Sequence, residues 1–414
     1  MKVISLLPWL VAIAGLMLGA EEASAQHWEM VFGSSPQRLL LSPNLPPQIA
    51  ALVPKAPTSG TIRFQLPAST IVDGRLIVRI SNEAGSLPVR VAAASVVRVD
   101  EDGAVSGEST TRLTFGGRPG TILSTGAPAI SDPVSLPVGG RGPIVVNLYV
   151  PDGIWLYMAG GAVMTVAPGD QTRSAKLANA RSVLGRPLVT AIYAESAAPP
   201  KTIVALGDSI TDGNRFANVA FRGWTDTLRS RLGSGSEAEN LNLVNAGISG
   251  NRLLTEGMGE SGLARLDRDV LSVPGVEYLV VALGINDIGH AGGSEFFALA
   301  PPLTSDELIE GYRQVIARSH VRGLKVILGT ITPWEGSAVM TAPREALRVA
   351  VNNWIRTQRV ADGVVDFERA VQDPARPAAL RRSFDSGDHL HPNDAGYRAM
   401  GAAIDLKLFR SRSH

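Results

Sequence analysis

The second half of the chain alternates short apolar segments with helical patterns, and this alternation limits its fold more than any other feature. The segments that we predict to be buried strands are Thr202–Leu206, Leu241–Asn245, Glu277–Leu283, Lys325–Thr330 and Val364–Asp366. Helices are predicted at Ser305–His320, which begins with a capping box at Thr304-Ser-Asp-Glu307, and through Leu347–Ile355. Strands that alternate with helices form a parallel sheet with helices on both faces. Ligands bind beyond the carboxyl ends of such strands.

The first half is rich in Gly, Pro, Ser and β-branched residues from His27 to about Glu195. Its candidate strands are Thr61–Leu66, Arg75–Ile80, Val89–Ala93, Thr111–Phe115 and Ile144–Val150. Several alternate apolar with polar residues, and no helix of convincing length is apparent, so we predict a β-sandwich or a related barrel. Paired prolines in Ala194–Lys201 predict a linker. The expected domains are a β-rich accessory domain at 26–195 and an α/β domain at 196–414.

The N-terminus has the pattern of an export signal. Lys2 precedes an apolar run, Val3–Ala20, and small residues follow at Ala23-Ser24-Ala25. This pattern predicts a secretory signal peptide at residues 1–25 that is cleaved after Ala25. The alternative is an uncleaved anchor helix, because a run of about 18 residues is at the lower limit for crossing a bilayer. Pro8 and the cleavage site favour removal, so we expect a secreted or periplasmic protein without stable membrane insertion.

The composition excludes several classes of function. Lys and Arg number 39 against 38 Asp and Glu, so the net charge of +1 gives no indication of a nucleic-acid partner. Cysteine is absent, which excludes disulfides, thiolate nucleophiles and cysteine-bound zinc or iron–sulfur clusters. Dinucleotide-binding and P-loop motifs are not found either.

Two clusters of small residues follow predicted strands. In Leu206-Gly-Asp-Ser-Ile-Thr-Asp-Gly213, Ser209 lies in the turn after the strand, where a nucleophilic hydroxyl is exposed and Gly207 lets a carbonyl group approach. Taken alone, Gly-Asp-Ser could be an ordinary turn. The second cluster, Asn245-Ala-Gly-Ile-Ser-Gly-Asn251, could place the backbone N–H of Gly250 over Ser209, or could be a glycine-rich turn without a chemical role.

A third cluster, Val281-Ala-Leu-Gly-Ile-Asn-Asp-Ile-Gly289, carries a candidate side-chain donor. Asn286 at the strand end could offer its amide N–H to a developing oxyanion. An Asx turn that caps a helix is the alternative interpretation of Asn286. We predict that Asp287 is a structural capping residue.

The fourth cluster runs from Asp385 to Gly396 and contains Asp388, His389 and His391. Asp388 and His391 are three residues apart, so a tight turn would bring the carboxylate to one ring nitrogen and leave the other as a base. Pro392 is expected to start a helix. Metal binding by Asp388, His389 and His391 is the rival interpretation, although the usual zinc-helix motif is lacking and His389 should point away in an extended segment.

These four ordered blocks resemble the GDSL/SGNH hydrolase family, and the resemblance covers about Thr202 to Arg410. The four invariant residues that give the SGNH family its name, Ser, Gly, Asn and His, correspond to Ser209, Gly250, Asn286 and His391. The resemblance implies a flavodoxin-like three-layer α/β/α domain and cofactor-free ester hydrolysis. It further implies a catalytic triad of Ser209, His391 and Asp388. His389 is a departure, because many members have Gly at that position.

The expected activity is that of a secreted serine esterase. Resemblance to secreted bacterial arylesterases, acylhydrolases and carbohydrate esterases implies short-chain acyl, aryl or acetylated carbohydrate esters, with a small molecule or a polysaccharide as substrate. The implied oxyanion hole consists of the Ser209 and Gly250 N–H groups and the Asn286 side chain. Two alternatives stay open at this point: a non-catalytic glycan-binding protein on a hydrolase scaffold, and a metal-dependent deacetylase or phosphoesterase that uses Asp388, His389 and His391.

Overall fold

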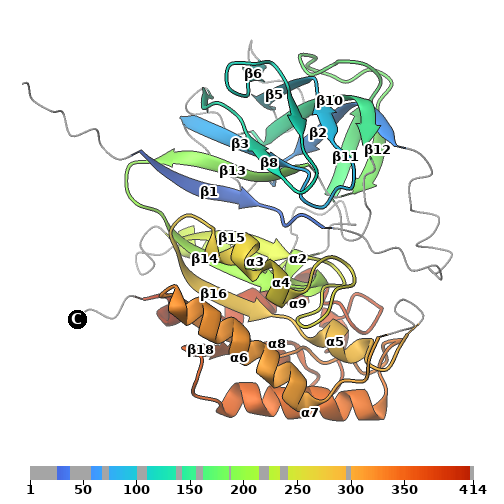
Figure 1. Ribbon diagram of the computed structural model, residues 1–414. Coiled ribbons are helices and arrows are strands. Elements are labelled where there is room, and N and C mark those ends of the chain that lie inside the picture. Colours follow the sequence, from blue (N-terminus) through green and yellow to red (C-terminus); the bar gives the residue numbers. More distant parts are fainter. Residues whose placement is uncertain are drawn as a thin grey trace, which may run out of the picture.

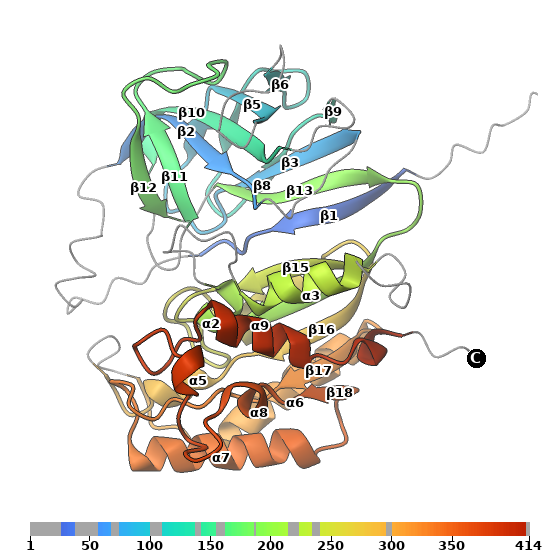
Figure 2. The same cartoon turned by 180° about the vertical axis from the view of Figure 1, so that it is seen from behind.

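The computed structural model of the 414-residue chain describes residues 26–37, 57–67, 74–99, 110–136, 142–154, 162–185, 188–213, 223–233, 241–294 and 300–410. The predicted export signal at 1–25 lies outside these ranges. Figures 1 and 2 show antiparallel strands above and an α/β layer structure below. Within the described ranges, no helix combines the length and the apolar character needed to cross a membrane.

Two antiparallel sheets make up the first half. One contains β1 (His27–Gly33), β13 (Val189–Ser196), β3 (Arg75–Ser81) and β8 (Pro128–Ile130), with β9 (Val134–Ser135) also paired to β3. The other contains β12 (Arg181–Gly185), β11 (Ala162–Ala167), β2 (Thr58–Gln65), β10 (Ile144–Ile154), β5 (Ala93–Arg98) and β6 (Thr111–Leu113). A separate pair consists of β4 (Val89–Val91) and β7 (Thr121–Leu123).

Side chains from both sheets share one hydrophobic core. Val78 of β3 and Val146 of β10 are both fully buried in it, as expected when two sheets pack face to face. The prediction of antiparallel β-structure is therefore confirmed. The predicted strand Val89–Ala93 is divided, because β4 pairs with β7 while β5, which begins at Ala93, pairs with β10.

The second half contains a parallel sheet in the order β15-β14-β16-β17-β18. Its strands are β14 (Lys201–Gly207), β15 (Leu241–Gly247), β16 (Val276–Ala282), β17 (Lys325–Gly329) and β18 (Gly363–Val365). Numbered along this half, the order is 2-1-3-4-5, which is that of flavodoxin-like sheets. The predicted flavodoxin-like α/β fold is confirmed. The order reverses at β14, and ligands bind at such points beyond the strands' carboxyl ends.

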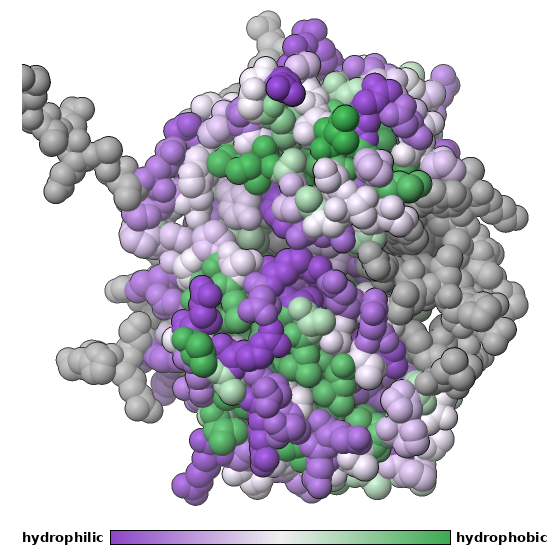
Figure 3. All heavy atoms as spheres, viewed as in Figure 1, coloured by the Kyte–Doolittle hydropathy of each residue, from purple (hydrophilic) through white to green (hydrophobic). Residues whose placement is uncertain are grey.

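Helices cover both faces of the parallel sheet. One face packs against α4 (Gly262–Leu266), the π-helix η1 (Asp267–Leu271), α6 (Ser305–Val321) and α7 (Ala342–Thr357). The other packs against α3 (Trp224–Gly233), α8 (Phe367–Val371), α9 (Asp394–Ala403) and the 3-10 turn η3 (Leu406–Phe409). Short turns at α2 (Ser209–Asp212), α5 (Ile285–Gly289) and η2 (Arg382–Phe384) complete this half. Figure 3 shows the face viewed in Figure 1 as a mixture of hydrophilic and hydrophobic residues.

The two long helices of this layer differ in how far they follow their predicted pattern. The capping box is present at the start of α6, where Thr304 and Glu307 bind each other's backbone N–H groups. In α7, however, two polar residues, Arg348 and Asn352, are buried together with Val351 and Ile355. The buried face of α7 is therefore not purely apolar, because these polar side chains find hydrogen-bond partners that only the folded chain supplies.

The connection between the two halves is shorter than predicted. β13 continues to Ser196 because Ala194 and Ser196 pair with Glu29 and His27 of β1, and β14 already begins at Lys201. Only residues 197–200 lie outside the strands, so the predicted linker at Ala194–Lys201 is too long. Strand pairing overrides the local composition of small residues. The proposed boundary at 195/196 falls at the end of β13.

The two halves also share a core. Met30 of β1 and Ala191 of β13 pack in the same hydrophobic cluster as Val244 of β15. A Cβ on Gly33 would lie 2.6 Å from Val244 Cγ1, so a larger residue at this position would force the Val244 side chain to shift. The side-chain amide of Asn242 donates to the carbonyl oxygen of Met30. The N-terminal sheets are therefore packed directly onto the parallel sheet.

Candidate active site

Three predicted site residues form one hydrogen-bonded chain. Ser209 is the first residue of α2, directly after β14, and its Oγ lies 2.8 Å from Nε2 of His391. Nδ1 of His391 lies 2.6 Å from Oδ2 of Asp388. If the imidazole is neutral, an N–H at Nδ1 donates to Asp388 and leaves Nε2 free to accept the Ser209 proton. The structure thus brings together a hydroxyl, a base and a carboxylate from opposite ends of the α/β half.

The turn that carries Asp388 and His391 is organised by the carboxylate itself. Oδ1 of Asp388 accepts hydrogen bonds from the backbone N–H groups of Leu390 (2.9 Å) and His391 (2.8 Å) and from the Ser386 hydroxyl (3.1 Å). Burial alone would raise the pKa of Asp388. The hydrogen bond and charge of His391, together with the two N–H groups, outweigh burial and hold this pKa well below its usual range. Asp388 is therefore an anion that can orient the imidazole and support its positive charge.

The residues around Ser209 explain the Gly-Asp-Ser-Ile-Thr-Asp string. A Cβ on Gly207 would overlap the Thr211 hydroxyl and lie 2.9 Å from the Ala282 carbonyl oxygen. The buried carboxyl of Asp208 accepts the N–H of Ile210 at 2.9 Å and so starts the α2 turn. Burial raises the pKa of Asp208 to about 7.

Asp212 connects this turn to the second predicted cluster. Its Oδ2 accepts a 2.9 Å hydrogen bond from the hydroxyl of Ser249, the residue before Gly250. Gly250 has a φ of +74°, and the turn that contains it is closed by the Asn251 N–H bound to the Ile248 carbonyl. Gly250 therefore occupies a left-handed conformation that favours glycine, next to the turn that carries Ser209.

The predicted oxyanion donors lie at the ends of three adjacent strands. Within the described ranges, neither the N–H of Ser209 nor that of Gly250 donates to another protein atom. The side-chain amide of Asn286 donates one N–H to the Asn251 carbonyl at 3.1 Å, which leaves its second N–H for a ligand. Asn286 thus uses its amide to contact the turn after Gly250, and no helix-capping hydrogen bond from it is observed at α5.

Asp287 has a structural role that differs from the predicted one. Its two carboxyl oxygens accept the N–H groups of Leu253 (2.7 Å) and Leu254 (2.9 Å), which lie in the loop after Gly250. It therefore anchors a neighbouring loop in addition to its place in the first turn of α5. Burial raises the pKa of Asp287 to about 6, although these hydrogen bonds act in the opposite direction.

His389 does not adopt the extended conformation that we expected. Its φ is +62°, in the left-handed region, and its Nδ1 lies 2.6 Å from Oδ2 of Asp385. This left-handed conformation is one that favours glycine. His389 is thus paired with Asp385, whereas His391 is paired with Asp388. Among the residues that the structure describes, no three His, Asp or Glu side chains are grouped to hold a metal ion.

The helix after the triad turn starts later than predicted. α9 begins at Asp394, and its N-cap is Asn393, whose side chain accepts the N–H groups of Ala395 and Gly396. Pro392 instead forms an isolated bridge with Asp385. The helix starts after Asn393 because the Asn393 side chain accepts the first free N–H groups of the helix. A helix that started at Pro392 would lack this side-chain acceptor.

Sequence reasoning missed two residues next to the site. Arg265 of α4 is fully buried and donates to the Gly207 carbonyl at 2.9 Å. Met258 lies over the second cluster, because a Cβ on Gly250 would be 2.6 Å from Met258 Cγ. Neither residue belongs to a motif, and arginine in a short helix is usually exposed. Nothing in the local sequence distinguishes them from ordinary surface residues.

Comparison with known proteins agrees with this geometry. The model of the GDSL-like lipase/acylhydrolase family matches residues 205–399, a range that contains every residue discussed for the candidate triad and oxyanion hole. Comparison with curated protein sequences gives no significant match.

Several solved structures are similar to the α/β half. A protein of the G-D-S-L family from Desulfitobacterium hafniense DCB-2 is 18% identical, with 49% of this chain and 97% of that chain covered and a TM-score of 0.37. The acetyl xylan esterase AlAXEase is 23% identical, with 49% and 96% covered and a TM-score of 0.38. Axe2, an acetylxylan esterase from Geobacillus stearothermophilus, is 22% identical, with 51% and 97% covered and a TM-score of 0.39.

Proposed function

The C-terminal half of this chain is a GDSL-like lipase/acylhydrolase domain, and from this premise we propose that it hydrolyses carboxylic esters with Ser209, His391 and Asp388 as its catalytic triad. The observation that carries the proposal is the continuous hydrogen-bonded chain from Ser209 Oγ through the His391 ring to Asp388. In this arrangement, the base is in contact with the nucleophile and is itself oriented by an anion.

The first half of the reaction forms an ester on the enzyme. Nε2 of His391 accepts the Ser209 proton as Oγ attacks the acyl carbon, and Asp388 stabilises the resulting imidazolium. The tetrahedral intermediate collapses when the bond from the acyl carbon to the alcohol oxygen breaks. His391 then gives its proton to the departing alcohol, which leaves the acyl group on Ser209.

The second half releases the acid. His391 removes a proton from a water molecule, whose oxygen attacks the acyl carbon, and the bond to Ser209 Oγ breaks as Oγ regains the proton. In both halves, the negative oxygen of the intermediate is bound by the N–H groups of Ser209 and Gly250 and by the free amide N–H of Asn286. Each such donor contributes about 3–4 kcal/mol to transition-state stabilisation.

We propose short acyl groups as the preferred acids. Met258 packs against Gly250, beside the proposed oxyanion hole, and we propose that it limits the space there for a long acyl chain. Aryl esters and acetylated carbohydrates both satisfy this requirement, because they differ in the alcohol and share a small acid. The proposed place of action is the periplasm or the medium, after removal of residues 1–25.

The decisive experiment compares wild-type protein with Ser209→Ala in the hydrolysis of p-nitrophenyl acetate. Ser209→Ala should abolish turnover and labelling by a fluorophosphonate, while an unchanged circular dichroism spectrum would show that the fold is intact. Ser230→Ala is a suitable control, because it removes an exposed hydroxyl of α3 that bonds the Asp226 carbonyl and contacts no residue of the proposed triad. Full activity in pure Ser209→Ala protein would refute the triad, and a wild-type protein that neither turns over esters nor labels would favour a binding function.

A further inference from the structure

A buried arginine lies beneath the proposed oxyanion hole. The Arg265 side chain has no exposed surface, and its guanidinium donates to the carbonyl oxygens of Gly207 (2.9 Å) and Ala246 (2.6 Å) and to Oδ1 of Asn251 (3.0 Å). Asp269 balances its charge at 3.0 Å. A cation buried in this way is stable only when its donors are satisfied, so these contacts define one position for the guanidinium.

Each of these acceptors lies within four residues of one of the proposed oxyanion donors along the chain. Gly207 ends β14, two residues before Ser209, and Ala246 lies in β15, four residues before Gly250. Asn251 directly follows Gly250, and its carbonyl holds the amide of Asn286. One guanidinium therefore contacts the backbone or side chains that set the positions of all three donors.

The N-terminal β-structure reaches the same guanidinium. Ser35, two residues after the end of β1, accepts a hydrogen bond from Nη1 of Arg265 at 3.2 Å and is itself buried. Two contacts keep β1 close to β15. Gly33 packs on Val244, and the Asn242 side chain donates a hydrogen bond to the Met30 carbonyl. Ser35 is thus placed by the pairing of β1 in the β-structure and contacts a residue of the α/β half.

We infer that Arg265 is a positioning residue for the oxyanion hole and that the N-terminal β-structure helps to hold it there through Ser35. This inference rests on the proposed esterase function and extends it to the role of the β-rich half. Arginine suits this position because its planar fork presents five N–H donors in fixed directions, which lysine cannot reproduce. The β-rich half is then part of the catalytic scaffold.

The test is Ser35→Ala in the full-length protein, because it removes one hydrogen bond and leaves the charge of Arg265 and its other acceptors in place. We expect kcat for p-nitrophenyl acetate to fall about two- to tenfold with KM nearly unchanged. The inhibition constant of a short alkyl boronic acid, which forms a tetrahedral adduct at Ser209, should rise by a similar factor. Arg265→Lys should have a larger effect of the same kind.

Ser95→Ala is the matched control. Ser95 is also a buried hydroxyl of the β-rich half, but it bonds the Thr172 carbonyl and Asn147 and does not contact Arg265. Its removal should leave kcat and the boronate inhibition constant at wild-type values. If Ser35→Ala behaves like Ser95→Ala in an active protein, or lowers kcat without weakening boronate binding, the inference is wrong while the proposed function stands. A wild-type protein without esterase activity would overturn both.

Discussion

Asn286 combines two tasks in one amide group. One N–H binds the Asn251 carbonyl, which orients the side chain, and the other is available to an oxyanion. A donor held in this way need not reorganise when charge develops on the substrate, which is the main source of its expected effect on rate. Its contribution should therefore appear in the transition state and hardly at all in substrate binding.

We expect Asn286→Ala to lower kcat for p-nitrophenyl acetate about 100- to 1000-fold with little change in KM. Steady-state kinetics on purified protein measures both constants. Asn353→Ala, on the exposed side of α7, serves as control and should retain wild-type kinetics. An unchanged kcat in Asn286→Ala would remove Asn286 from the oxyanion hole.

His389 holds a left-handed backbone conformation without being glycine. Its ring pairs with Asp385, and this contact opposes the conformational cost of its φ of +62°. Both His389→Gly and His389→Ala lose the ring contact, but only alanine keeps a Cβ that disfavours this conformation. We expect His389→Ala to be less stable than His389→Gly by about 1 kcal/mol. Urea unfolding measures the difference, and equal or reversed stabilities would show that the turn relaxes to another conformation.

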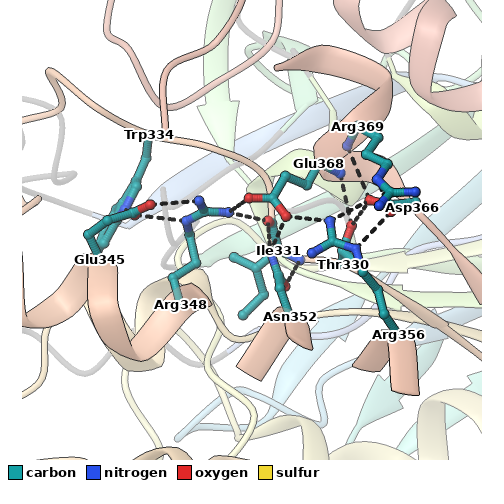
Figure 4. A network of polar contacts seen from close by, with 10 residues as sticks. All are labelled: Thr330, Ile331, Trp334, Glu345, Arg348, Asn352, Arg356, Asp366, Glu368 and Arg369. Atoms are coloured by element: carbon teal, nitrogen blue, oxygen red, sulfur yellow. Dashed lines mark hydrogen bonds and ion pairs between the residues drawn. The ribbon is translucent and has the colours of Figure 1, made fainter. Parts of the chain in front are cut away.

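At the scale of elements, a buried charge network joins α7 to the end of β17 and to α8 (Figure 4). Arg348 binds Glu345 at 2.7 Å, Glu368 at 2.6 Å and the Ile331 carbonyl at 2.9 Å. Asn352 of α7 binds both the N–H and the carbonyl of Ile331 at 2.8 Å. These bonds hold the loop after β17 in place, and that loop lies beside the buried residue Asp208. The network therefore fixes a loop that lines the same small cavity as Asp208 and Ile210.

Arg348→Met should destabilise the protein by about 3 kcal/mol, because it leaves the partly buried Glu345 without a cation and the buried Glu368 with Arg356 alone. Chemical denaturation at neutral pH gives the free energy of unfolding. Arg90→Met is the control, since Arg90 and its partner Asp152 form an exposed ion pair on the β-rich half and the change there should be far smaller. Similar losses in the two variants would mean that the buried network is dispensable.

At the scale of the whole molecule, buried carboxyl groups make stability depend on pH. Burial raises the pKa of Asp208 to about 7 and that of Asp287 to about 6, above the ordinary value of 3.8. The folded protein therefore keeps these protons to a higher pH than the unfolded chain does. The stability that they contribute is complete below about pH 4 and is lost as the pH rises through about 6 to 7.

Asp208→Asn should remove part of this dependence, because asparagine is neutral at every pH and its Oδ1 can still accept the Ile210 N–H. Relative to wild type, the variant should gain at least about 1 kcal/mol of unfolding free energy between pH 5 and pH 8. Urea unfolding at both pH values measures this gain. Asp306→Asn, at an exposed position of α6, should show no such gain. A constant difference between Asp208→Asn and wild type would show that Asp208 is ionised throughout this range.

The local sequence was sufficient for the strands of the α/β half and for the positions of the four motif blocks. Each strand is a short apolar run, and each of the first three blocks follows directly after one, so its strand-end position can be predicted from chain order alone. The Asp388–His391 turn is also local, because the carboxylate and the imidazole are only three residues apart. The contact of Ser209 with His391, by contrast, was predicted from the family resemblance.

Tertiary structure alone decided the remaining features. The last residues of β13 are strand because β1 lies beside them, and Arg348 and Asn352 are buried because α8 and the loop after β17 supply their partners. Arg265 is also buried because long-range packing supplies its partners. Its hydrogen-bond acceptors come from segments that are distant in the chain. Hydropathy and motif spacing indicate which secondary structure and which degree of burial a residue and its near neighbours in the sequence favour. A buried charge depends instead on the partners that long-range packing brings within hydrogen-bond distance.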